Sequence, residues 1–157
     1  MSRSALLDFN IYGHPATAHE DIFNGNLTTD IVSLANYGGV IFTVVKGPGA
    51  TGTATITVES CDDTSATTAT AVAFNYIACT SGNTWGNITA AGTAGFTTTA
   101  GANQTYCVEI RDDQLSGSDK YVRAVYTETA NDPVDGAVFS MGVDPKFPAD
   151  PPKEMIT

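Results

Sequence analysis

The sequence predicts an all-β protein, a jelly-roll-like β-sandwich of about seven to nine antiparallel strands. Several segments alternate apolar and polar residues with a period of two, which is the pattern of a half-buried strand. Clusters of Gly, Pro, Asn and Asp separate these segments at the spacing of turns. No segment has the 3.6-residue periodicity of an amphipathic helix. Together these observations indicate strands joined by turns, with extended arms at both ends.

The first part of the chain predicts an arm followed by two strands. Residues 1–26 are interrupted by turn signals and are expected to form an irregular N-terminal arm. Residues 40–46 are apolar on both faces, as in a strand in the interior of a sandwich. Residues 53–59 alternate apolar side chains with threonines and a glutamate, which predicts a strand with one solvated face. We expect the GPGATG segment to join these two strands as a hairpin.

The middle of the chain predicts one strand and a long excursion. Residues 71–77 are expected to form a single strand with Val72, Phe74 and Tyr76 on one face. Residues 79–103 are rich in Gly, Thr, Ala and Asn. We expect this segment to be partly exposed, with short strand-like pieces at 85–88 and 96–99.

Three strands are predicted in the last third of the chain. They cover residues 104–111, 121–128 and 137–141, and the first places Tyr106, Val108 and Ile110 on one face. The sandwich domain is therefore expected over residues 27–143. Residues 144–157 carry several prolines and are expected to run extended as a C-terminal tail.

The charge of the chain excludes two classes of partner. Lys and Arg number 7 against 17 Asp and Glu, which gives a formal net charge of −10 over 157 residues. Such a field repels nucleic-acid phosphates and anionic membranes, so neither is an expected partner. The N-terminus lacks the apolar core of a signal peptide, and no run is long enough for a membrane helix. We therefore expect a protein made and kept in the cytoplasm, or one that leaves it by a route other than secretion.

Histidines offer little for catalysis. His14 and His19 are the only two in the chain, and both lie in the predicted arm. A metal site would need further ligands, and a catalytic triad needs groups held to fractions of an ångström. We expect both side chains to be exposed arm residues. No catalytic, cofactor-binding or metal-binding residue is predicted, and we expect the protein not to be an enzyme.

Acidic pairs occur in three predicted turns. They are Asp62 with Asp63, Asp112 with Asp113, and Asp132 with Asp135. Loop carboxylates are ligands for Ca²⁺, but none of these pairs has the spacing of a calcium loop. Asp also favours turns because its side chain accepts local backbone hydrogen bonds. We prefer this turn interpretation and leave a bound cation as the alternative.

The aromatic residues allow two interpretations. Trp85, Tyr76, Tyr106 and Tyr121 are candidates for a sugar-stacking surface. Tyr76 and Tyr106 lie on the apolar faces of their predicted strands, which favours packing in the core instead.

The cysteines also leave an alternative open. Cys61, Cys79 and Cys107 are widely spaced and lack the motifs of a zinc site. We expect three quiet thiols, with one disulfide and a leftover thiol as the alternative.

The order of the predicted strands resembles a known family. The segments are DIVSLANYGGVIFTVVKG, GTATITVESCDDTSATTATAVAF and YCVEIRDDQLSGSDKYVRAVYTET, followed by a closing strand, within residues 29–142. The order and pattern of these segments resemble those of the head decoration, or cement, proteins of tailed bacteriophages. The resemblance implies a β-sandwich without catalytic residues that binds the outside of an icosahedral capsid.

Partners and location follow from the same resemblance. It implies contact with the major capsid protein, a homotrimer at threefold positions, and a location on the virion after synthesis in the cytoplasm of the bacterial host. A head–tail or tail accessory protein is one alternative. A glycan- or receptor-binding β-sandwich that uses the region of Trp85 is another.

Overall fold

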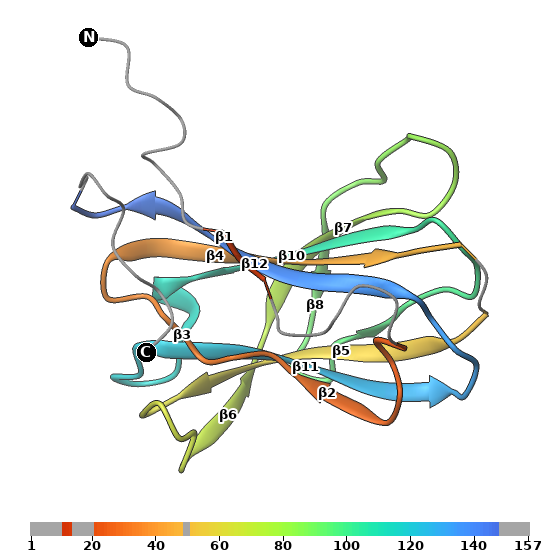
Figure 1. Cartoon of the computed structure of the whole chain (residues 1–157). Coiled ribbons are helices and arrows are strands. Elements are labelled where there is room, and N and C mark those ends of the chain that lie inside the picture. Colours follow the sequence, from red (N-terminus) through yellow and green to blue (C-terminus); the bar gives the residue numbers. More distant parts are fainter. Residues whose placement is uncertain (1–10, 14–20, 49–50, 148–157) are drawn as a thin grey trace, which may run out of the picture.

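Two antiparallel β-sheets face each other in the computed structural model, which describes residues 11–13, 21–48 and 51–147 (Figure 1). The predicted all-β sandwich is therefore confirmed. The described residues contain no α-helix, and the one short helix is the 3₁₀ turn η2 (Asp112–Gln114). They form twelve strands instead of about seven to nine, because several short strands extend the sheet edges.

The first sheet, called sheet 1, has six strands. In spatial order they are β1 (Ile11–Gly13), β12 (Gly136–Pro145), β4 (Tyr37–Lys46), β10 (Thr105–Arg111), β7 (Phe74–Cys79) and β8 (Thr89–Ala91). All neighbouring pairs are antiparallel. The long strands β12, β4 and β10 thus occupy the middle, with short strands at both edges.

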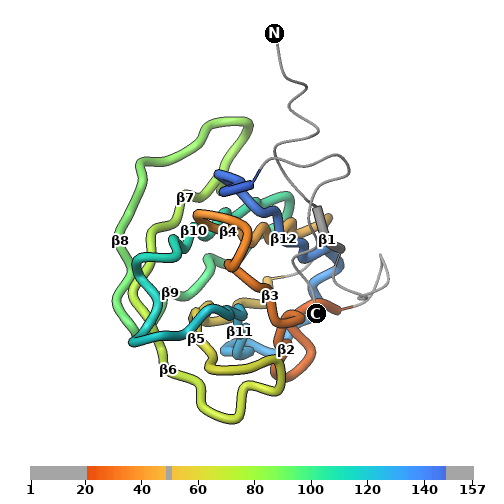
Figure 2. Tube along the Cα trace, turned by 90° about the vertical axis from the view of Figure 1, so that its left-hand side faces the viewer, coloured from red at the N-terminus to blue at the C-terminus, as the bar shows by residue number. Residues whose placement is uncertain are grey.

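The second sheet, called sheet 2, is built around β11 (Tyr121–Ala130) and β5 (Thr53–Cys61). Its order is β2 (Asn26–Thr28), β11, β5 and β6 (Ala69–Val72). Two shorter strands complete it: β3 (Val32–Ser33) pairs with β11, and β9 (Phe96–Thr97) pairs with β5. Figure 2 shows sheets 1 and 2 as two layers.

The core lies between the layers and is made by alternate residues of each long strand. Fully buried apolar side chains include Val40 and Phe42 of β4, Ile56 and Val58 of β5, and Val108 of β10. Each such side chain stabilises the fold by about 1.5–3 kcal/mol relative to an exposed position. The alternation predicted for residues 53–59 and 104–111 is confirmed, and strands also cover 121–128 and 137–141 as predicted.

The predicted hairpin between residues 40–46 and 53–59 is wrong. β4 belongs to sheet 1, where β12 and β10 take up its two edges. β5 belongs to sheet 2 and pairs with β11, β6 and β9. The chain crosses between the layers after Lys46, so two strands that are adjacent in sequence face each other across the core.

The single strand predicted at residues 71–77 is also wrong. It is divided at Ala73 into β6, which pairs with β5 in sheet 2, and β7, which pairs with β10 in sheet 1. Val72 and Phe74 are both buried in the common core. A strand that switches sheets in this way forms a corner of the sandwich.

The excursion over residues 79–103 is largely exposed up to Ala90, as predicted. The strand piece expected at 85–88 is wrong: these residues form no strand, and the next strand, β8, begins at Thr89. The piece expected at 96–99 is present as the shorter β9.

The ends of the predicted domain contribute to the fold in part. Ile22 and Phe23, within the expected arm, are buried in the core. Asp144 and Pro145, within the expected tail, end β12. Lys146 and Phe147 follow β12 and are exposed, and residues 148–157 lie outside the described residues.

Candidate docking face

The outward face of sheet 2 is polar, and its side chains bond to one another. Thr55 on β5 bonds to Thr97 with 2.9 Å between hydroxyl oxygens. The guanidinium Nε of Arg123 on β11 donates to the Glu59 carboxylate at 2.8 Å. A face of threonines and ion pairs is well solvated and offers little apolar area to a partner.

The outward face of sheet 1 is different because its central strands carry apolar residues on both sides. Strand register aligns Met141, Ile41 and Glu109 in one row across β12, β4 and β10. We call the apolar members of this surface the apolar face. They are Ile41, Val45, Ile77, Phe139, Met141 and Val143. All six side chains are partly exposed, and Val45 reaches 36%.

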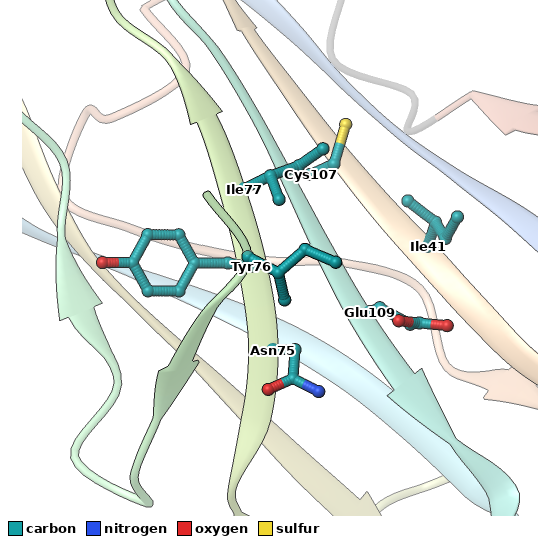
Figure 3. Close-up of a pocket in the computed structure, with 7 residues that line it drawn as sticks. Ile41, Asn75, Tyr76, Ile77, Cys107 and Glu109 are labelled. Atoms are coloured by element: carbon teal, nitrogen blue, oxygen red, sulfur yellow. The ribbon is translucent and has the colours of Figure 1, made fainter. Parts of the chain in front are cut away.

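A shallow pocket of about 160 Å³ opens on this face. Figure 3 shows Ile41, Ile77 and Cys107 among the side chains that line it. The remaining lining residues are Asn75, Tyr76, Glu109 and the exposed Ile88. This volume is below the roughly 300–1,000 Å³ of typical small-molecule sites. The pocket therefore fits a protruding side chain better than a substrate.

Cys107 is a quiet thiol inside this pocket. Burial raises the pKa of its thiol, and the Thr43 hydroxyl, 3.7 Å from the sulfur, lowers it by a smaller amount. Nucleophilic cysteines have a lowered pKa beside a base or cation. The pocket is therefore suited to binding and lacks the arrangement that activates a nucleophile.

Basic side chains of the described residues are mostly engaged. Arg111 pairs with Asp144 at 2.5 Å, and Lys146 pairs with Asp112 at 2.6 Å. Arg123 pairs with Glu59 as described above. Because these cations are neutralised locally, the excess of acidic residues dominates the field around the molecule.

Lys46 is buried inside the fold, at 1% exposure. Its ammonium Nζ donates to the backbone oxygens of Gly52 and Thr99, both at 2.9 Å, and lies 5.9 Å from the centroid of the Phe23 ring. Burial lowers the pKa of this lysine. The side chain joins two loops at one end of the sandwich and is not available to an external partner.

The acidic turns behave as the turn interpretation predicts. The Asp63 carboxylate accepts hydrogen bonds from the backbone N–H groups of Ser65 and Thr67, and Thr67 lowers the pKa of Asp63 most. Asp62 accepts from the N–H of Thr68.

The other acidic pairs are also used locally. Asp132 accepts from the N–H and hydroxyl of Thr51, and Asp112 pairs with Lys146. Among the described residues, no three His, Cys, Asp or Glu side chains gather where they would hold a metal ion. His14 and His19 lie outside the described residues.

The candidate sugar-stacking residues are not brought together. Tyr106 is 2% exposed and belongs to the core, and Tyr76 stacks on Phe96 with ring centroids 3.7 Å apart. Tyr121 lies on the other sheet. Only Trp85 presents a largely exposed ring, at 47%. Core packing is thus confirmed for Tyr106.

The cysteines form no disulfide: Cys61, Cys79 and Cys107 are all free. Cys61 and Cys79 are buried as small apolar residues.

The apolar face was missed from the sequence, although a signal was present. Residues 40–46 are apolar on both faces, and we interpreted this as complete burial. In an antiparallel sandwich the outward side of such a strand faces solvent. Ile41 and Val45 are therefore surface residues, and the same pattern recurs at Phe139 and Met141 of β12.

Comparisons with known proteins add no assignment. No protein-family model matches the chain, and neither a curated protein nor a solved structure matches it.

Within the described residues, no helix has the length and apolar character needed to cross a membrane.

Proposed function

We propose that this protein is a structural component of a bacteriophage virion. It decorates and stabilises the outer surface of the icosahedral capsid by bridging subunits of the major capsid protein. The proposal joins the family resemblance of residues 29–142 to the surface chemistry of the fold. It includes a location on the capsid and assembly as a homotrimer, both carried by the resemblance.

The observation that carries the proposal is the acidic surplus on a rigid sandwich. Arg111, Arg123 and Lys146 are each paired with a carboxylate, and Lys46 is buried. Uncompensated acidic side chains keep many copies soluble and favour docking onto basic patches of a shell. Many copies that each bridge neighbouring subunits add small contacts into a large gain in shell stability.

Capsids with and without the protein provide the test. Particles that lack the protein are incubated with the purified chain, and bound copies and rupture temperature are measured. We expect saturable binding and a higher rupture temperature for the decorated particles. We also expect weaker binding as salt rises, since the contact is electrostatic. Equal rupture temperatures with full occupancy would contradict a cementing role.

Particle imaging tests the location at the same time. Density on the outer shell is expected, whereas density confined to the neck or tail would support an accessory role there instead.

One observation favours a second function, a glycan- or receptor-binding module. Trp85 is 47% exposed in a loop rich in Gly, Thr and Asn, and exposed aromatic rings stack on sugars. A glycan array with the purified chain tests this. Sugar binding that is lost in Trp85→Ala supports the alternative, and an array without specific signals removes it.

A further inference from the structure

The apolar face is nearly neutral on an otherwise acidic molecule. Among the outward positions of β12, β4, β10 and β7, the charged residues are Glu109 and Arg111. Nη1 of Arg111 lies 2.5 Å from the Asp144 carboxylate at the end of β12 and 3.8 Å from Oε1 of Glu109. These three side chains together carry a charge of −1 (one cation against two carboxylates), a small part of the net −10 of the chain. A basic partner would gain little on this surface compared with the acidic turns.

Pairing of an added strand with a sheet edge is a less favourable way for this protein to associate than contact through the apolar face. The edge strands β1, β8 and β2 have three residues each, and β6 has four. Short edge strands limit the number of backbone hydrogen bonds that an added strand gains. The wide face of sheet 1 is therefore the larger described surface open to association.

We propose that the apolar face binds the apolar face of a second copy of this chain. Two molecules with a net charge of −10 repel each other along most approaches. Contact through the neutral face avoids most of this repulsion and removes apolar area from water on both sides. A second copy is the partner that certainly carries a matching neutral and apolar surface.

The size of the face sets the expected affinity. Four strands spaced about 4.8 Å apart, with about seven residues each rising about 3.3 Å, cover roughly 450 Å². This footprint is about half of the roughly 800 Å² that each partner buries in a standard specific interface. We therefore expect weak, concentration-dependent association and not an obligate dimer.

The inference is independent of the proposed virion role. It concerns the free protein in solution, and capsid binding is measured in a separate experiment. Failure of this inference leaves capsid binding standing. A trimer whose association the face variants leave unchanged would refute the assigned interface and keep the proposed homotrimer.

Sedimentation velocity over a protein concentration series is the test. The variant Ile41→Lys places a charge in the middle of the face, next to its cross-strand neighbour Glu109, which pairs with it in the monomer. Val45→Glu introduces the opposite charge at the most exposed position of the face. Thr127→Lys is the matched control, since Thr127 is exposed on β11 of the opposite sheet.

We expect the wild type and Thr127→Lys to associate as concentration rises. Both face variants should associate at least about a hundredfold more weakly, because removing a charged side chain from water is costly even when a nearby charge partly compensates it. Circular dichroism establishes that each variant keeps its β-structure. A wild type that stays monomeric at high concentration, or folded face variants that associate like the wild type, would refute the proposal.

A second readout needs no substitution. Cys107 lies in the pocket of the apolar face, whereas Cys61 and Cys79 are buried. The rate of alkylation of Cys107, followed by mass spectrometry, should fall as protein concentration rises. A rate that is independent of concentration while the protein associates would place the interface elsewhere and overturn the assignment.

Discussion

Tyr106 and Tyr126 are both buried, but only Tyr106 has hydrogen-bond partners for its hydroxyl. The Tyr106 hydroxyl donates to the side-chain oxygen of Gln104 at 2.8 Å and accepts from the N–H of Thr99 at 3.0 Å. The Tyr126 hydroxyl is buried without a partner. Replacing each tyrosine with phenylalanine removes the same atom from these two environments, so the same substitution has opposite consequences.

The magnitudes follow from the groups left behind. Tyr106→Phe leaves the buried side-chain oxygen of Gln104 without its donor, whereas the N–H of the exposed Thr99 can bond to water. One buried unsatisfied group costs about 1–3 kcal/mol, so we expect a loss of about that size. Tyr126→Phe removes a buried hydroxyl that costs about 1–3 kcal/mol to desolvate. We expect this variant to be as stable as the wild type or more stable by up to about that amount.

Urea denaturation measures both free energies of unfolding from the midpoint and the slope. Equal slopes indicate that the substitutions act on stability and not on the compactness of either state. A loss of stability in Tyr126→Phe equal to that in Tyr106→Phe would refute the reasoning, because it would show that the ring contacts of Tyr126, and not its unpaired hydroxyl, decide the outcome.

The same two variants should also differ in how their free energy of unfolding depends on pH. Burial raises the pKa of Tyr126 above its ordinary value of 10.0. The folded state then holds a proton that the unfolded chain releases, so this contribution is complete below pH 10 and is lost as the pH rises above it. The alkaline decline in unfolding free energy should be smaller in Tyr126→Phe than in Tyr106→Phe.

Three further predictions concern other positions. Gly95 has φ +71°, and an added Cβ would overlap the backbone oxygen of Ile56, so Gly95→Ala should lose about 3 kcal/mol or more in urea denaturation. Gly82→Ala is its control, since it has φ +59° with open space around it and should lose only about 1–2 kcal/mol. Burial raises the pKa of the Cys61 thiol, so the folded state keeps a proton that the unfolded chain releases above about pH 9. The stabilisation that follows from this raised pKa is complete below about pH 9 and is lost as the pH rises further. In thermal melts from pH 7 to 10, the alkaline decline in melting temperature should be smaller in Cys61→Ala than in the wild type. Trp85→Ala should change the free energy of unfolding by less than about 0.5 kcal/mol, because the ring is largely exposed; a larger loss would show that this loop packs on the domain.

The sequence predicted which residues are buried better than it predicted which strands pair. Alternation at Ala54, Ile56 and Val58 reports one face against the core, and this is independent of the neighbouring strand. The same alternation continues through Val72 and Phe74 although the chain changes sheets at Ala73. Because both sheets face the same interior, the alternation of apolar residues is the same before and after the chain changes sheets. The change is seen only in the strand pairing, where β6 pairs with β5 and β7 pairs with β10.

The apolar face was harder to predict than the core for a related reason. Apolar residues on both sides of a strand are expected in a fully buried strand and also in a strand whose outward side meets a partner. Ile41 and Met141 become distinguishable from core residues only once β12 and β4 are known to be neighbours in an outer layer. The acidic charge, by contrast, was readable at once, since the sequence alone shows the excess of Asp and Glu.

The proposed capsid docking and the proposed self-association predict opposite responses to salt. Electrostatic docking of acidic turns onto a basic shell weakens as salt screens the charges. Association through the apolar face strengthens under the same change, because screening reduces the repulsion between two acidic copies while the apolar contact is hardly affected. Taken together, the two proposals predict that low ionic strength favours binding to a shell over self-association. Because the apolar face is confined to sheet 1, the two contacts use different surfaces and should be separable by salt concentration alone.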